Sequence, residues 1–324
     1  MFISRAEIID KMNYLSGRKE PFIFAIDYPG EKGFVMSPKN ADNIGIRHNF
    51  CTPEKHEKKR SETPLKFDLF PVGIEAYQTA FEKVKYHLQR GDSYLLNLTF
   101  PTGVRSNYSL SGIFDISHAR YKLFVPGHFV VFSPEPFVHI RDSLISICPM
   151  KGTIDAAIPG AGLKLLADDK ESFEHNTIVD LIRNDLAMVS TNVAVTRSRY
   201  LERIHTNRGD LLQMSSEISG DLPVNYTEHI GDILFALLPA GSVTGAPKEK
   251  TVEIIRSAES YERGFYTGIF GFFDGHELTS AVSIRFIEQT FDGLVFKSGG
   301  GITALSEMES EYHEMIQKIY VPVI

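Results

Sequence analysis

The chain has no tryptophan and two cysteines among its 324 residues, and charge of neither sign dominates. Cys51 and Cys148 are too few for a disulfide framework or a metal-binding knuckle, so we expect a reduced, cytoplasmic protein. No apolar run reaches the roughly 18 residues of a membrane-spanning helix, and the amino terminus lacks the apolar core of a signal peptide. The net charge of −7 gives no reason to expect binding to nucleic acid or to anionic membranes.

What is present is an ordinary globular composition, with 43% hydrophobic and 23% charged residues. Apolar residues at helical spacing predict helices over 4–15, 75–90, 168–188, 248–257 and 306–319. Short β-rich runs predict strands over 21–26, 93–100, 128–132, 137–140, 144–148, 193–196, 199–204, 267–273, 278–287 and 294–298. A polar loop is expected over 51–64, and the glycines at 299–301 should interrupt the last strand. Because strands come in neighbouring runs, an α+β fold with antiparallel sheets is favoured.

Two E-x-x-E patterns lie on separate predicted helices. Glu171 and Glu174 share one helix face with core residues, and Glu311 and Glu314 repeat the spacing. Carboxylates near a core are costly unless compensated, for example by a cation. An oxygen-only ligand set suits Mg²⁺, whereas a solvated acidic face is the alternative for either pair alone. Zinc is rejected because Glu171 stands where an H-x-x-E-H motif ending at His175 needs histidine.

Two further residues are candidates for catalysis. Glu135 stands between two prolines, which hold its backbone extended, so it is either a positioned acid or base or a plain turn residue. Lys151 follows a predicted strand and precedes Gly152. Desolvation would lower the pKa of this lysine and make it a nucleophile, whereas a surface lysine is the common case.

Glycine-rich segments offer places for anions. The segment 239–248 (PAGSVTGAPK) leads into a helix whose amides are suited to an anion, although it is not a Walker A motif. The glycines at 299–301 leave amides open to a carboxylate. Arg285, in a predicted apolar strand, is a candidate for a bidentate carboxylate contact or an internal ion pair. The combined features predict a Mg²⁺ site that binds a small polycarboxylate.

Eight blocks, taken in order, resemble the chorismate-utilising enzymes, which include anthranilate, aminodeoxychorismate, isochorismate and salicylate synthases. The blocks are SPEPF (133–137), PMKGT (149–153), DDKESFEHNTIVDLIRND (168–185), PAGSVTGAPK (239–248), RGFYTGIFGFF (263–273), IRF (284–286), SGGGIT (298–303) and ESEYHEM (309–315). The resemblance implies two large, mostly antiparallel sheets packed face to face with helices outside. It also implies a catalytic domain over 71–324, with 1–70 as a reduced amino-terminal region of the same domain.

Within the family, Lys151 makes the chain most similar to component I of aminodeoxychorismate synthase, also called para-aminobenzoate synthase component I. There this lysine is the covalent nucleophile, whereas anthranilate synthases carry a small residue. The resemblance implies a transferase that aminates chorismate at C4 with Mg²⁺, on the route to p-aminobenzoate and folate. The ammonia would come from a separate glutaminase subunit, and the product would be 4-amino-4-deoxychorismate.

The resemblance also implies roles for individual residues. Glu135 is the general acid and base, Glu174 and Glu314 bind Mg²⁺, and Glu171 and Glu311 act through water or from a second shell. The ring carboxylate would be held by Gly152, Thr153, Ser242, Gly299, Gly300 and Gly301, and the enolpyruvyl carboxylate by Tyr266 and Arg285.

Two departures from the family bear on the reaction. Leu95 stands where relatives have glutamine or a water-activating lysine, which argues against hydroxylation at C2. Gln213 stands where relatives carry a histidine associated with pyruvate loss, which favours retention of pyruvate. An anthranilate synthase-like enzyme and a catalytically silent, partner-binding paralogue remain the alternatives, and a tryptophan-type regulatory pocket in 1–70 is left open.

Overall fold

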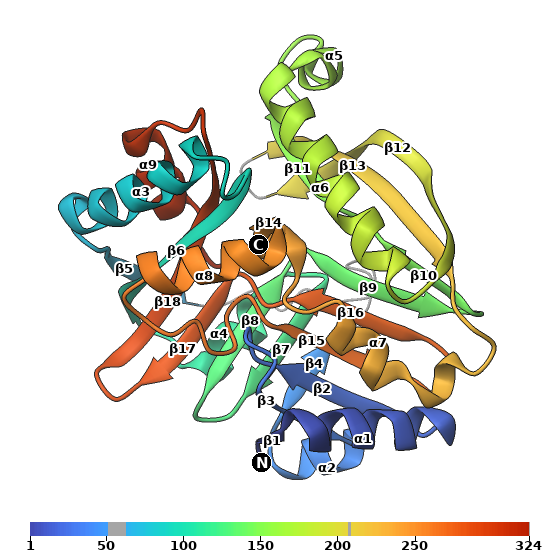
Figure 1. Cartoon of the computed structure of the whole chain (residues 1–324). Helices are drawn as coiled ribbons and strands as arrows, with labels where there is room; N and C mark the ends of the chain where they lie inside the picture. Colours follow the sequence, from blue (N-terminus) through green and yellow to red (C-terminus); the bar gives the residue numbers. More distant parts are fainter. Residues whose placement is uncertain (51–62, 207–208, 324) are drawn as a thin grey trace.

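The computed structural model describes residues 1–50, 63–206 and 209–323, with residues 151, 170, 205 and 206 described by their backbone alone. Two β-sheets form the middle of the molecule, and helices lie around them (Figure 1). All strand pairings among the described residues are antiparallel. The predicted α+β fold with antiparallel sheets is therefore confirmed.

The larger sheet joins the amino-terminal strands to strands from the rest of the chain. Its order is β1 (Ile3–Ser4), β3 (Lys32–Met36), β2 (Phe22–Ile26), β15 (Ile269–Phe273), β16 (Leu278–Val282), β9 (Pro136–Arg141), β10 (Leu144–Ile147), β13 (Gly209–Asp221) and β11 (Met150–Asp155). A further strand, β12 (Thr191–Thr206), forms a long hairpin with β13. The five residues of β2 are all buried, as the predicted strand over 21–26 requires.

The smaller sheet carries the glycine run. Its order is β14 (Gly245–Ala246), β6 (Leu95–Ser106), β18 (Gly293–Thr303), β17 (Phe286–Thr290), β8 (Phe129–Ser133), β7 (Tyr121–Val125) and β4 (Arg47–Asn49), and β5 (Phe67–Phe70) pairs with β6. The two sheets face each other across a shared apolar cluster. The larger sheet contributes Ile23, Phe34 and Phe270 to this cluster, and the smaller one Leu123 and Phe286.

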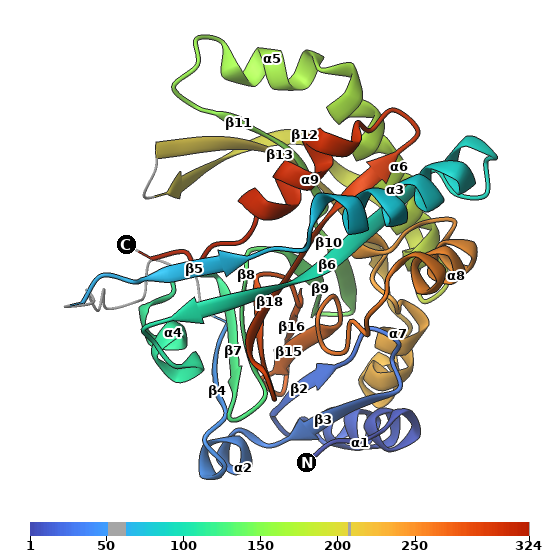
Figure 2. The ribbon, with the colours of Figure 1, turned by 90° about the vertical axis from the view of Figure 1, so that its left-hand side faces the viewer.

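The helices pack on the outer faces and ends of the sheets. They are α1 (Arg5–Gly17), α2 (Pro38–Asn43), α3 (Ile74–Gln89), α4 (Leu110–Ile116), α5 (Ala161–Ala167), α6 (Asp169–Ala187), α7 (Ile230–Ala236), α8 (Lys248–Ala258) and α9 (Met308–Gln317). Figure 2 shows α3 and α9 beside β6 and β18, with which they are in contact. Helix α6 contacts β11, β12 and β13 at the other end of the molecule.

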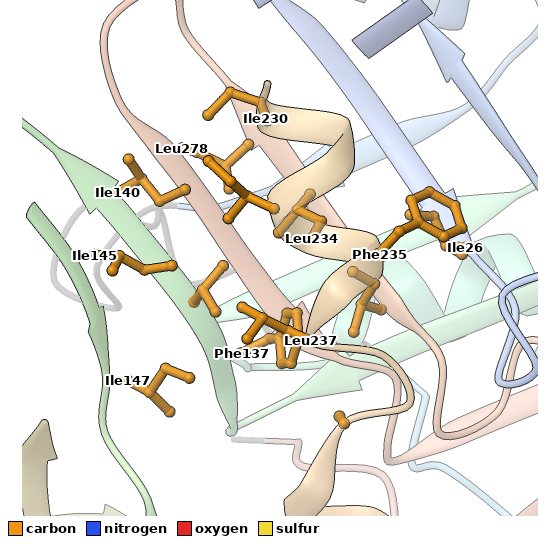
Figure 3. Close-up of a cluster of buried hydrophobic side chains, with 14 of the residues drawn as sticks. Ile26, Phe137, Ile140, Ile145, Ile147, Ile230, Leu234, Phe235, Leu237 and Leu278 are labelled. Carbon is orange, nitrogen blue, oxygen red and sulfur yellow. The ribbon is translucent and has the colours of Figure 1, made fainter. Parts of the chain in front are cut away.

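A second apolar cluster covers the outer face of the larger sheet. Ile230 and Leu234 of α7 lie against Ile140, Ile145 and Leu278 of the sheet (Figure 3). These side chains are all buried, and each fully buried Leu or Ile contributes roughly 1.5–3 kcal/mol. The apolar spacing that predicts the helices reflects packing of this kind.

Two strand predictions are wrong in ways that affect the site. The run 278–287 is not one strand, because it breaks between β16 and β17 at Arg285, whose φ is 53°. The glycines do not interrupt β18 but lie inside it, paired with β6. A Cβ on Gly299 would come within 2.3 Å of the Leu98 carbonyl oxygen, so glycine permits the close approach of the two strands.

Other differences are smaller. The strands predicted over 193–196 and 199–204 form the single strand β12, whose pairing shifts register where two strands were expected. Of the loop expected over 51–64, residues 51–62 lie outside the described residues.

Candidate active site

Glu135 lies in the link between β8 and β9, where its main chain is fixed from two sides. Its N–H donates to Ser133 Oγ at 3.1 Å, and its carbonyl oxygen accepts from the Val282 N–H at 3.1 Å. The Ser242 hydroxyl donates a hydrogen bond to Glu135 Oε1. The predicted acid–base residue and the predicted anion-binding serine are therefore in direct contact.

A small cavity of about 20 Å³ adjoins this contact, with Cys148, Asp185 and Gly241 in its walls. Asp185 of α6 is buried and pairs with Lys248, at the start of α8, at 2.8 Å. Burial raises the pKa of the Asp185 carboxyl, and Lys248 acts in the opposite direction. This ion pair joins α6 to the segment that carries Ser242.

Arg263, which sequence reasoning missed as a functional candidate, connects the segments around Ser242. It is buried and bonds to Glu259 through both Nε and Nη2. Its Nη1 donates to the Val243 carbonyl at 3.0 Å, and its Nη2 donates to the Asn97 carbonyl at 2.6 Å. Burial alone would lower the pKa of this guanidinium, but Glu259 outweighs burial and the pKa is raised. The spacing of Glu259 and Arg263 on the chain, four residues apart, was the available signal.

Tyr266 and Arg285 occupy neighbouring turns beside Glu135. Tyr266 is buried, and burial raises the pKa of its phenol, with electrostatic contributions from Arg285 and Glu135 among others. The ion pair considered for Arg285 is not formed, since its guanidinium has no carboxylate within 4.0 Å among the described residues. The structure thus places Tyr266 within electrostatic range of both Glu135 and Arg285.

The glycine run and α9 form a second part of the site. A Cβ placed on Gly300 would lie 3.5 Å from Glu311 Oε2 and 3.7 Å from Glu314 Oε1, so both carboxylates reach this strand. Lys318 pairs with Glu314 at 2.7 Å and donates to the Gly299 carbonyl at 3.2 Å. Sequence reasoning missed Lys318, although it stands four residues after Glu314 on the same helical face.

Strand β11 and α6 form a third part. Gly152 has φ +78°. A Cβ placed on it would lie 3.1 Å from Glu171 Oε2, so this glycine faces α6. Thr153 pairs with Gln213 of β13 and is exposed. The backbone of Lys151 lies in β11, and its side chain lies outside the described part of the structure.

The two glutamate pairs stand on helices that lie apart in Figure 1. Glu174 is half-buried on α6, whereas Glu311 of α9 is only 4% exposed. In the described part of the chain, His, Cys, Asp and Glu side chains form no group of three or more that could hold a metal ion. The four glutamates are therefore placed as two pairs, each beside one of the predicted glycines, and not as one cluster. His175, next to Glu174, is hydrogen-bonded to Ser216 at 2.7 Å.

The two family departures occupy different environments. Leu95 is 4% exposed and belongs to the apolar cluster on the larger sheet, so it contributes no polar group to the site. Gln213 lies between Thr153 on one side and Glu202 on the other in the β11–β13–β12 pairing. Its position beside Thr153 places it next to the predicted carboxylate-binding segment.

The sequence model of a protein family, the chorismate binding enzymes, matches residues 34–323. The chain belongs to this family. It is 51% identical to an uncharacterised PabA-like protein of Pasteurella multocida over 97% of this chain and 98% of that one. It is 38% identical to anthranilate synthase component 1 of Archaeoglobus fulgidus over 91% and 72% of the two chains. It is 30% identical to aminodeoxychorismate synthase component 1 of Bacillus subtilis over 77% and 55%.

A solved structure extends the likeness of the fold to nearly the whole chain. The menaquinone-specific isochorismate synthase MenF of Escherichia coli superposes with a TM-score of 0.73 at 16% identity, over 97% of this chain and 80% of that one. The two face-to-face antiparallel sheets are thus the fold of a chorismate-utilising enzyme. No described helix combines the length and the apolar character that crossing a membrane needs.

Proposed function

We propose that this family member is component I of an aminodeoxychorismate synthase, a transferase that aminates chorismate at C4. The observation that carries the proposal is Lys151, in β11 immediately before Gly152, which faces Glu171. By the family resemblance, a lysine at this position would occupy the route to C2 that a C2-amination enzyme needs open. The Bacillus subtilis relative, named aminodeoxychorismate synthase component 1, supports the same reaction class.

The residue types beside the glycines suit Mg²⁺, and we propose that the ion binds between the two glutamate pairs, which stand separately in this structure. The donor set is oxygen alone, from Glu174 and Glu314 with Glu171 and Glu311 behind them, and Mg²⁺ prefers carboxylate oxygen. Glu311 is 4% exposed and lies with Glu314 beside Gly300, so this pair presents carboxylate oxygens at the glycine run. When bound, the ion would neutralise and fix the ring carboxylate of chorismate.

The chain's own residues then carry the chemistry. The neutral Lys151 amine attacks ring C2, the ring double bonds shift, and the C4 hydroxyl leaves as water with a proton from Glu135. Ammonia attacks C4, the bond between C2 and Lys151 breaks, and Glu135 takes the surplus proton of the new amine. The sum is chorismate plus ammonia giving 4-amino-4-deoxychorismate plus water, with the enolpyruvyl group retained.

The source of ammonia is part of the proposal. A separate glutaminase subunit would supply it, and a separate lyase would convert the product into p-aminobenzoate. The names of two relatives, from Pasteurella multocida and Haemophilus influenzae, refer to PabA, and this is compatible with a place in the same pathway.

Anthranilate synthesis is the second candidate. The observation that favours it is the 38% identity to anthranilate synthase component 1 of Archaeoglobus fulgidus, higher than the 30% to the Bacillus subtilis enzyme. Two residues oppose it. Lys151 stands where amination at C2 would need space, and Gln213 stands where relatives carry the histidine that is linked to pyruvate loss.

Product identification separates the candidates. The chain is incubated with chorismate, Mg²⁺ and ammonium at alkaline pH, with and without added aminodeoxychorismate lyase, and the products are analysed by chromatography and mass spectrometry. The proposal predicts p-aminobenzoate only when the lyase is present. Fluorescent anthranilate would establish the second candidate, and unchanged chorismate would favour a silent paralogue.

A further inference from the structure

Arg285 is an unusual cation in this structure. It lies on the turn between β16 and β17, and the Phe132 N–H donates to its carbonyl oxygen at 3.1 Å. Its Nε is buried and has no hydrogen-bond acceptor among the described residues. A buried donor left without an acceptor costs roughly 1–3 kcal/mol, so the site favours a ligand that accepts from it.

The described contact of the Arg285 guanidinium is with an aromatic ring. Tyr320 lies just after α9, and the Arg285 guanidinium carbon is 4.7 Å from the centre of its ring. All five guanidinium N–H groups point outward in the plane of the group. A ring beside the cation can hold it without accepting its in-plane N–H groups in pairs, as a carboxylate would.

Other arginines show the contrast. Arg263 donates hydrogen bonds to Glu259 and to main-chain carbonyls, and Arg47 donates to Asp115 and Ser111. Both also lie over aromatic rings, so the stacking itself is not unusual. Arg105, Arg120 and Arg197 lie over rings as well, but they are exposed to solvent. What distinguishes Arg285 is that its Nε is buried and has no acceptor among the described residues.

The backbone fixes the ring. Ile319 and Val321, on either side of Tyr320, are buried in the apolar cluster that α4 shares with the smaller sheet. The Pro322 carbonyl accepts from the His118 N–H at 2.6 Å. Because Ile319 and Val321 are buried and Pro322 is hydrogen-bonded, Tyr320 projects away from that cluster and is 41% exposed.

We infer that Tyr320 is a positioning residue for the substrate, because it holds Arg285 so that Nε and one Nη meet both oxygens of a carboxylate. The inference rests on the proposed function and on the family resemblance, which assigns the enolpyruvyl carboxylate of chorismate to Arg285. Removing the ring frees the arginine side chain, which must then be ordered again on binding. Chorismate affinity should fall while the chemical steps at Lys151 and Glu135 stay intact.

Chorismate affinity of the full chain tests this by titration calorimetry with Mg²⁺ and without ammonium, followed by KM and kcat with ammonium. Tyr320→Leu should weaken Kd and raise KM by about five- to thirtyfold, with kcat within about twofold. Tyr320→Phe keeps the ring and should bind like the wild type. In an Arg285→Lys background, Tyr320→Leu should cost no more than about twofold further.

Tyr14→Leu is the matched control, since Tyr14 is exposed and lies over Arg18 at 5.4 Å on α1. It should leave chorismate affinity unchanged. An unchanged Kd in Tyr320→Leu, or an equal loss in Tyr320→Phe, would overturn the inference. Binding of chorismate with formation of another product would refute the proposed reaction while still testing Tyr320, and no binding by the wild-type chain would overturn both.

Discussion

The two halves of the site that carry the glutamate pairs are built differently. On one side, Glu311 is buried against β18, which is paired with β6 along its length over the Arg263–Glu259 ion pair. On the other side, Glu171 is half-buried on α6, beside a hairpin whose β12 strand has no buried side chain among those described. The β12–β13 pairing also shifts register three times. The first half is thus held by a continuous strand pair and a buried ion pair, whereas β12 in the half that bears Lys151 is held by fewer buried contacts.

The largest difference should follow from removing Arg263. Arg263→Met leaves Glu259 buried without its cation and should lower the free energy of unfolding by about 3–5 kcal/mol, measured by urea denaturation. Adding Glu259→Gln to that variant should restore part of the loss. A loss below about 1 kcal/mol would contradict the view that this pair fixes the first half.

Gly299→Ala should have the next largest effect on stability. The added methyl group meets the Leu98 carbonyl oxygen at 2.3 Å, so β6 and β18 must separate, at a cost of about 1–3 kcal/mol. Gly300→Ala is the matched control, because its nearest atoms lie at 3.5–3.7 Å. That variant should fold with nearly unchanged stability but lose activity, since its methyl group lies beside Glu311 and Glu314. Equal melting temperatures for the two variants would be against this interpretation.

Arg199 is the counterpart of Arg263 in the second half. It is half-buried in β12 and donates to the Leu166 carbonyl and to Ser172 Oγ, which ties the hairpin to α5 and α6. Arg199→Met leaves no buried carboxylate behind, so it should cost about 1–2 kcal/mol by urea denaturation. A cost as large as that of Arg263→Met would remove the contrast between the halves.

The smallest effect concerns pH and the ion pair that links the halves. Burial raises the pKa of Asp185, so its proton is held more tightly in the folded chain than in the unfolded one. Protonated Asp185 therefore contributes to the free energy of unfolding. This contribution is complete below the pKa of Asp185 in the unfolded chain and is lost as the pH rises through its pKa in the folded chain. Wild-type stability should therefore fall relative to that of Asp185→Asn as pH rises above about 4. Parallel stability curves for the two chains over that range would contradict the raised pKa.

The sequence was informative where the signal was local. The apolar spacing that predicts α3 and α6 reflects packing on a single face. The family blocks identify Tyr266, which the structure places within electrostatic range of both Glu135 and Arg285. These predictions need only the residue types and their order.

The failures depend on contacts across the fold. The place of the glycine run inside β18 depends on the carbonyls of β6, which a scan along one segment does not contain. Arg263 has the local sequence pattern of a surface arginine. Its burial depends on Asn97, Val243 and Glu259, which come from three separate segments. Tyr320 gives no pattern at all, because its partner lies on a turn that was predicted as strand.

The most direct test of the proposed reaction compares the products of the wild-type chain and Lys151→Ala under identical conditions. Both are given chorismate, Mg²⁺ and ammonium, and both are assayed for 4-amino-4-deoxychorismate and for anthranilate. We predict that the wild-type chain forms 4-amino-4-deoxychorismate and that Lys151→Ala, still folded and able to bind chorismate, forms none. Unchanged turnover in Lys151→Ala, or anthranilate from the wild-type chain, would contradict amination at C4 through a covalent lysine.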